Sequence, residues 1–191
     1  MINKEEAYDT QTIENNIGLP CFVKPNRAGS SFGVSKVTAS EQWKHAIKEA
    51  FKHDDQVLIE AFIDGIEVTC GLIEKEGELI ALPLTEITTE NDFFDYEAKY
   101  EGKSQEITPA RVSDEIKEQV QSISKKIYNT LHLKGLVRMD YIVEKDQAYL
   151  IEINTIPGLS EESIIPQQAA CYGISLKQLF SLTLEPIFLH D

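Results

Sequence analysis

The sequence predicts an α+β fold of two subdomains, each built around antiparallel β-strands. Short apolar runs separated by glycine-containing or polar turns are typical of β-hairpins, while other stretches carry apolar residues at helical spacing. A strand-like run is interrupted at Gly65, so we divide the chain there into residues 1–64 and 65–191. With 191 residues, 42% of them hydrophobic, the chain is long enough to bury a core.

Strands and one helix are expected in the first subdomain. They are strands at 21–24 and 34–37, a helix from Ser40 to about Lys52, and a strand at 56–62. The residues up to Asn16 show weak periodicity and no clear start of a domain, and ordered signals begin at Gly18. A loop at 29–33 predicts a hairpin with a long tip. Ser40 is a good N-cap, and Trp43, Ile47 and Phe51 then repeat along one helix face.

The second subdomain alternates paired strands with helices. The expected elements are strands at 67–73 and 79–87, a loop at 88–108, a helix from Ser113 to Leu131, strands at 136–144 and 148–154, and helices at 163–172 and from Ser175 to near Pro186. Ser113 is a typical N-cap, Gly173 suits a helix end, and Ser175 with Gln178 resembles a capping box.

Composition excludes several classes of function. A net charge of -14 with scattered basic residues disfavours nucleic-acid binding. No apolar stretch approaches the length that a membrane span needs, so we expect a cytoplasmic protein without a membrane partner. The histidines form no metal-ligand spacing. Three widely separated cysteines, Cys21, Cys70 and Cys171, indicate buried reduced thiols and no disulfide framework.

Two acidic residues are expected to meet on one hairpin face. If 145–147 is a three-residue loop, then Asp140 lies opposite Glu152, Arg138 opposite Asn154, and Glu144 opposite Ala148. Opposed like charges are destabilising unless a cation compensates. Two carboxylates and an amide oxygen suit Mg²⁺ or Mn²⁺, and the spacing could hold two such ions.

The alternative for this hairpin is an ordinary strand pair with its charges in solvent. The opposite parity is apolar and is expected to face the core, so the acidic face borders a cleft or water. The residues of that apolar face are Val137, Met139, Tyr141, Val143, Tyr149, Ile151 and Ile153.

Three other segments are compatible with nucleotide binding. The loop after Lys24 combines glycines with hydroxyl side chains, and its backbone amides can approach phosphate oxygens closely. The alternative is that this loop is an ordinary hairpin tip. Residues 60–67 cross the junction as strand, break and strand, and are either an adenine-binding edge or a kinked strand. Residues 94–100 alternate aromatic and charged groups, as in a lid over a reacting phosphate or in an exposed turn.

The order of these segments resembles the D-alanine–D-alanine ligases of the ATP-grasp family, from about Gly18 to the C-terminus. The segments are KPNRAGSSFGVSKV, EAFIDGIE, FFDYEAKY, ITPA, RMDYIV and EINTIPGLSEESIIP. The resemblance implies an ATP-grasp fold whose two α+β subdomains enclose a nucleotide cleft. It implies ATP as co-substrate, two magnesium ions, and two D-alanines joined through an acyl phosphate for peptidoglycan synthesis.

The resemblance also implies roles for individual residues. Those for ATP are Lys24, Ser30, Ser31, Glu60, Phe62, Ile63, Glu67 and Lys99; those for metal are Asp140, Glu152 and Asn154; those for catalysis are Arg138, the Gly158 backbone, Lys99 and Ser30; and those for the second D-alanine are Tyr100, Ser163 and Ile164. Tyr100 follows the lid lysine as in the dipeptide-forming branch, which favours D-alanine over D-lactate.

The departure from the family lies at the front of the chain. Family members carry a whole N-terminal domain and the beginning of the central domain, so residues 1–64 correspond to a partial central subdomain. We expect this chain alone to bind Mg·ATP weakly and to make no dipeptide, and the complete enzyme to be a homodimer. The alternatives are a related carboxylate ligase, such as a D-alanine–D-lactate ligase, and a non-catalytic nucleotide-binding module.

Overall fold

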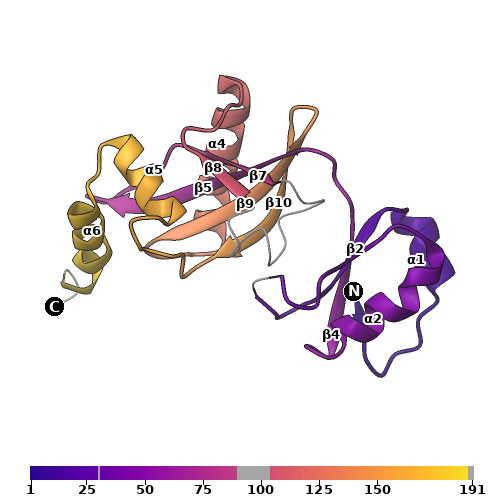
Figure 1. Ribbon diagram of the computed structural model, residues 1–191. Coiled ribbons are helices and arrows are strands. Elements are labelled where there is room, and N and C mark those ends of the chain that lie inside the picture. Colours follow the sequence, from indigo (N-terminus) through magenta and orange to yellow (C-terminus); the bar gives the residue numbers. More distant parts are fainter. Residues whose placement is uncertain (30, 90–103, 189–191) are drawn as a thin grey trace. The chain divides into compact units, whose positions relative to one another are not determined.

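The computed structural model describes residues 1–29, 31–89 and 104–188. These residues form two compact units, which we treat separately (Figure 1). Unit 1 comprises Met1–Ile63, and unit 2 comprises Asp64–Thr88 together with the chain from Ser104 onward. Both units pair their strands in antiparallel fashion and pack helices on a sheet, so the predicted α+β class is confirmed.

Unit 1 is a four-stranded sheet with helices on one face. Its elements are β1 (Ile2–Asn3), α1 (Thr10–Ile17), β2 (Cys21–Pro25), β3 (Ser35–Val37), the 3-10 turn η1 (Ser40–Gln42), α2 (Trp43–Ala50) and β4 (Gln56–Ala61). The strand order is β1-β4-β2-β3. Cys21 and Val23 are fully buried under Trp43 and Ile47 of α2, whereas the intervening Phe22 lies on the other face.

Two local expectations for unit 1 are wrong. Helix α1 exists although its periodicity is weak, because Asp9 caps it by accepting hydrogen bonds from the backbone N–H of Gln11 and Thr12. Ser40 does not cap α2: its hydroxyl donates to Glu14 at 2.9 Å. The strand-to-helix corner is held by Gln42, whose Oε1 accepts from the Thr38 backbone N–H at 2.6 Å.

Unit 2 contains a six-stranded sheet between helices. Its elements are β5 (Ile66–Lys75), β6 (Glu78–Ala81), β7 (Thr85–Thr89), β8 (Ser104–Ile107), α4 (Asp114–Thr130), β9 (Val137–Glu144), β10 (Gln147–Asn154), α5 (Ile164–Tyr172) and α6 (Leu176–Phe188). The strand order is β10-β9-β5-β7-β8, and β6 also pairs with β5. The expected strand at 79–87 is therefore two strands, separated at Pro83, which lacks the N–H that a ladder needs. The expected loop at 88–108 is wrong at both ends, because β7 continues to Thr89 and β8 begins at Ser104.

Two apolar layers sandwich the central strand β5. Val68, Cys70 and Leu72 pack on the α4 side with Val120, while Ile73 packs on the other side with α5 and α6. Figure 1 shows α4 and the α5–α6 pair as separate groups around this sheet. The continuous burial of β5 explains why its sequence reads as an apolar run rather than a simple alternation.

The helix ends of unit 2 follow their predicted signals. Ser113 accepts a hydrogen bond from the Ile116 backbone N–H, and Ser175 and Gln178 form the reciprocal capping box. Gly173 ends α5 in the left-handed region at φ 94°. Cys171 does not match its prediction, because it is exposed on α5, whereas Cys21 and Cys70 are buried.

Candidate functional site

The β9–β10 hairpin turns more tightly than predicted. Glu144 pairs with Gln147 rather than Ala148, which leaves only Lys145 and Asp146 in the turn. Both turn residues have positive φ, 45° and 67°, as a two-residue type I′ turn requires. The three-residue loop is therefore wrong, and this change alone would shift every later pair by one position.

A β-bulge between Leu150 and Glu152 cancels that shift. Ile151 is the extra residue, and beyond it Asp140 pairs with Glu152 and Arg138 with Asn154. The two predicted pairs are confirmed, although by a different route from the one assumed. The four side chains consequently lie on one face of the hairpin.

The predicted apolar face is correct for β9 and partly wrong for β10. Val137, Met139 and Tyr141 are fully buried, whereas Tyr149 and Ile151 are 39% and 37% exposed. The tighter turn places Tyr149 opposite Ile142 and so outside the core-facing parity, and Ile151 is the unpaired residue of the bulge.

Asp140 is the central acid of the hairpin and is only 7% exposed. Arg138 donates two hydrogen bonds to this carboxylate, from Nε to Oδ1 at 2.9 Å and from Nη2 to Oδ2 at 2.8 Å. Thr69 of β5, directly opposite in the sheet, donates its hydroxyl to Oδ1 at 2.5 Å. The carboxylate is thus fixed in one orientation by two neighbouring positions.

Arg138 is surrounded by negative charge. Burial acts to lower its pKa, but the hydrogen bond with Asp140 and the charges of Asp140, Glu152 and Glu106 raise the pKa above its ordinary value. Burial in turn raises the pKa of Glu106, against a hydrogen bond from Gln167 and the charge of Arg138. Arg138 therefore remains a fixed cation at this face.

Oxygen donors for a divalent cation lie beside this pair. Glu152 is opposite Asp140 in the sheet, and Asn154 Nδ2 donates to Glu152 Oε1 at 3.2 Å. Two carboxylates and an amide are the hard ligands that Mg²⁺ takes, and adjacent carboxylates favour an added cation. Among the described residues, no three His, Cys, Asp or Glu side chains are placed so that they could hold a metal ion together, so any ion here would also rely on Asn154 and external oxygens.

Helix α5 approaches the same face of the sheet. Gly71 is paired with Arg138, and a Cβ on Gly71 would lie 2.5 Å from both Gln168 Oε1 and Ile165 Cδ1. Glycine is needed here because α5 packs directly on the β5 backbone. Glu67 shares this side of β5, since it alternates with the core-facing Val68.

Ser163 and Ile164, expected at the second substrate site, lie close to Gly158, whose backbone is expected at the oxyanion. A Cβ on Gly158 would lie 2.8 Å from Ser163 Oγ, so the Gly158 backbone and the Ser163 side chain are in contact range. Ser163 and Ser160 share a hydroxyl hydrogen bond at 2.8 Å. Ile164 begins α5 and is 8% exposed.

Several residues expected at the nucleotide lie on the face of the unit 1 sheet that is opposite to α1 and α2. Lys24 and Glu60 form an ion pair at 2.7 Å. Phe62 follows β4, packs against Phe22 at 6.0 Å between ring centroids, and has the Lys36 ammonium 4.4 Å from its own centroid. Ile63 is the last residue of the N-terminal segment that belongs to this unit.

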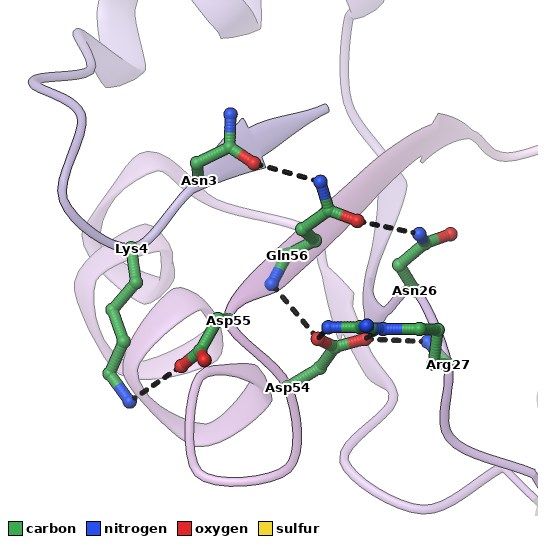
Figure 2. Close-up of polar contacts among 7 residues, drawn as sticks. All are labelled: Asn3, Lys4, Asn26, Arg27, Asp54, Asp55 and Gln56. Atoms are coloured by element: carbon green, nitrogen blue, oxygen red, sulfur yellow. Dashed lines mark hydrogen bonds and ion pairs between the residues drawn. The ribbon is translucent and has the colours of Figure 1, made fainter.

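The glycine-rich loop of unit 1 contains Ser31, which has a positive φ of 58°. Figure 2 shows the start of this loop tied to the turn before β4, where Asp54 faces Arg27 and Gln56 faces Asn26. The predictions for Ser30, Lys99 and Tyr100 lie outside the described residues.

Sequence reasoning missed four polar residues that organise these sites. They are Thr69, Glu106, Arg27 and Asp54. For Thr69 a signal existed, because it stands at the parity opposite to Val68 and Cys70. The Arg27–Asp54 contact joins positions that no spacing rule connects.

Among the described residues, no helix has the length and apolar character that crossing a bilayer requires. Across residues 1–185 the chain matches the family model described as D-ala D-ala ligase C-terminus. The chain belongs to the D-Ala–D-Ala ligase family. Its fold is accordingly ATP-grasp, as the resemblance implied.

Full-length relatives of this family are longer than the chain. The chain is 53% identical over 184 residues to D-alanine–D-alanine ligase from Flavobacterium johnsoniae. This alignment covers 96% of the chain and 57% of the relative. The chain is equally identical to the ligase from Christiangramia forsetii, covering 96% and 56%. The chain thus spans little more than half the length of the curated relatives it matches.

Solved ligases have the same fold. A D-Ala:D-Ser ligase from Enterococcus faecalis superposes with a TM-score of 0.82 at 36% identity, covering 92% of this chain and 51% of that one. A D-alanine–D-alanine ligase from Bacillus anthracis, complexed with ATP, gives 0.79 at 30% identity, covering 96% and 58%.

Proposed function

We propose that this chain supplies the ATP- and metal-binding part of a ligase that joins two D-alanines for peptidoglycan synthesis in the cytoplasm. The observation that carries the proposal is the convergence of Arg138, Asp140, Glu152 and Asn154 on one hairpin face, in a chain of the D-Ala–D-Ala ligase family. A one-residue register error would have separated these groups, so their alignment supports a shared task.

The hairpin would hold the metal and the reacting oxygen. Asp140, Glu152 and Asn154 are the ligands we assign to two Mg²⁺ or Mn²⁺ ions, which when bound supply positive charge against the triphosphate. Arg138, already fixed by Asp140, would face the oxyanion that forms when an amine attacks the acyl phosphate, together with the Gly158 N–H.

The nucleotide residues are assigned by the same resemblance. Lys24, Ser30 and Ser31 would bind phosphates, and the ion-paired Glu60 would join the adenine and ribose contacts. Phe62, Ile63, Glu67 and Lys99 complete the set. Because ATP and a carboxylate are both anions, the lysines and Arg138 would offset their repulsion before phosphoryl transfer.

The proposed reaction has two steps. The γ-phosphoryl of ATP moves to the carboxylate of one D-alanine, leaving ADP, and the amine of a second D-alanine then attacks the acyl phosphate, forming the peptide bond and releasing phosphate and the amine proton. Ser163 and Ile164, with Tyr100, would hold the second D-alanine. We also expect the complete protein to pair as a dimer, which sedimentation analysis would test.

The second substrate has one specific rival. A D-Ala:D-Ser ligase shares the fold at 36% identity, so D-serine joins D-lactate as an alternative acceptor. Phosphate release by the complete natural protein, with D-alanine, D-serine or D-lactate added as acceptor, should be fastest with D-alanine. Faster phosphate release with D-serine or D-lactate would show that D-alanine is not the preferred acceptor.

Calorimetry of Mg·ATP tests the metal site directly. In Asp140→Asn plus Glu152→Gln the magnesium-dependent part of ATP affinity should fall by at least about tenfold, because both anionic ligands are lost. The matched control is Glu144→Gln plus Asp146→Asn, which also removes two negative charges, but at the turn end of the hairpin. Binding that is insensitive to magnesium in the unmodified chain would refute the metal site and favour a non-catalytic module.

A further inference from the structure

The glycine-rich loop of unit 1 is fastened to the segment between α2 and β4. At its entry, the Asn26 backbone N–H donates to Gln56 O at 3.0 Å, and Asn26 Nδ2 donates to Gln56 Oε1 at 3.1 Å. At its exit, Gly33 has φ 73°, and a Cβ there would lie 2.6 Å from the His53 ring. The loop therefore takes its shape from a neighbouring segment that lies 20 to 30 residues later in the chain.

Asp54 is the centre of this attachment (Figure 2). Its carboxylate accepts from the Arg27 backbone N–H at 2.8 Å, from Arg27 Nε at 3.1 Å, from Arg27 Nη2 at 2.6 Å and from the Gln56 backbone N–H at 3.2 Å. The Asp54 side chain is 3% exposed, whereas that of Arg27 is 70% exposed. The acid is thus the buried, multiply bonded partner of the pair.

We propose that Asp54 is a positioning residue for triphosphate binding: by holding the Arg27 backbone and guanidinium, it sets the glycine-rich loop that follows Lys24. This inference rests on the proposed function, since it assumes that the loop binds phosphate.

If Asp54 had no positioning role, its carboxylate would only disfavour anion binding at this loop. Asp54 places a negative charge at the base of the loop and occupies the Arg27 cation that could attract phosphate directly. A two-point guanidinium–carboxylate contact fixes both distance and plane, so its gain is geometric. The backbone bond to Arg27 N carries this geometry into the main chain, where the loop amides are.

The neighbouring Asp55 provides a matched control. It carries the same charge one residue later, but its side chain is 76% exposed and pairs with Lys4 at 3.1 Å, away from the glycine-rich loop. Asp54→Asn and Asp55→Asn therefore change net charge equally. Only the first removes a charge-assisted bond to the loop.

Calorimetry on the 191-residue chain separates positioning from general stability. Asp54→Asn should weaken Mg·ATP by about tenfold while adenosine affinity stays within about twofold of wild type, both measured well below the thermal midpoint of Trp43 fluorescence, which should itself fall because the buried acid loses its charge-assisted bonds. Asp55→Asn should match wild type in all three. Equal Mg·ATP affinity of the two variants, or a parallel loss of adenosine binding in Asp54→Asn, would overturn the inference.

Hydrogen exchange tests the attachment without nucleotide. The Arg27, Phe32 and Val34 amides, which are bonded in the loop, should exchange about tenfold faster in Asp54→Asn than in Asp55→Asn. If wild type binds no Mg·ATP, the proposed function fails, and unchanged loop exchange would separately overturn the inference. Should Asp54→Asn not fold, Arg27→Lys keeps the charge but loses the two-point contact, and the same faster exchange is expected.

Discussion

Among single residues, Glu86 forms an ion pair in unit 2 that is independent of the proposed site. It is 6% exposed, and Arg111 binds it through Nε at 2.9 Å and Nη2 at 2.7 Å. These hydrogen bonds hold the pKa of Glu86 below its ordinary value of 4.5, although burial opposes the shift. The folded state therefore prefers the ionised carboxylate.

Glu86 should contribute to stability in a pH-dependent way. Because its folded pKa is lowered, its contribution is fully present above about pH 4.5 and is lost as pH falls through the folded pKa. We expect Glu86→Gln to lower the urea midpoint at pH 7, and the gap from wild type to narrow toward pH 3. The exposed Glu118→Gln is the control. A gap that widens on acidification would contradict the assignment.

The site residues differ in how far sequence predicts them. The pairing of Asp140 with Glu152 was predicted correctly only because two features that the sequence did not reveal, the tighter turn and the bulge, cancel each other. Asp54 and Glu106 could not be predicted, since each acts through a partner brought close only by tertiary folding. Such contacts have no fixed spacing along the chain.

Among elements, the attachment of α5 to β5 depends on one buried amide. Gln168 is fully buried; its Oε1 accepts from Gly71 N at 3.0 Å, and its Nε2 donates to Thr69 O at 2.9 Å and to Thr85 Oγ1 at 3.1 Å. It thereby satisfies backbone groups of β5 in the stretch where the flanking ladder passes from β7 to β6. Thr69 is also the residue that donates to Asp140.

Replacing this amide should cost more than replacing its neighbour. Gln168→Leu leaves a buried N–H and two buried oxygens without their partner, and should destabilise unit 2 by about 2–4 kcal/mol. Gln167→Leu, which loses bonds to Glu106 and Glu162 near the surface, should cost under about 1 kcal/mol. Chemical denaturation followed by far-UV circular dichroism measures both, and equal losses would contradict this role for Gln168.

Helices and strands were largely predictable because their apolar period and caps are local. The Ser113 cap and the Ser175–Gln178 box appear in the structure as the sequence implies. The two-residue turn at Lys145 and Asp146 was not predictable, because such turns favour Asn-Gly or Asp-Gly, and Lys-Asp is not a typical sequence for one. Helix α1 was missed because none of its residues is fully buried.

For the whole molecule, the two units have separate cores. The core of unit 1 contains Trp43, the single tryptophan, whose Nε1 donates to Glu14 at 2.8 Å. The two cores of unit 2 lie on either side of β5, and neither shares a residue with the core of unit 1. Trp43 fluorescence therefore reports on unit 1.

Core substitutions should accordingly affect the two units separately. Ile47→Ala should lower the fluorescence midpoint through a loss of about 2–5 kcal/mol, and Leu179→Ala should lower the circular dichroism transition of unit 2 by a similar amount while leaving Trp43 unchanged. Movement of both transitions by either substitution would show that the units unfold together.

The bulge at Ile151 has a consequence for length changes in this hairpin. Without Ile151, Glu152 and Asn154 would move to the opposite side of β10, toward the α4 layer, while Arg138 and Asp140 stayed in place. A one-residue insertion in the Lys145–Asp146 turn would compensate that deletion. Insertions and deletions here are therefore tolerable as pairs, and a single unpaired one separates the proposed metal ligands without altering any of them.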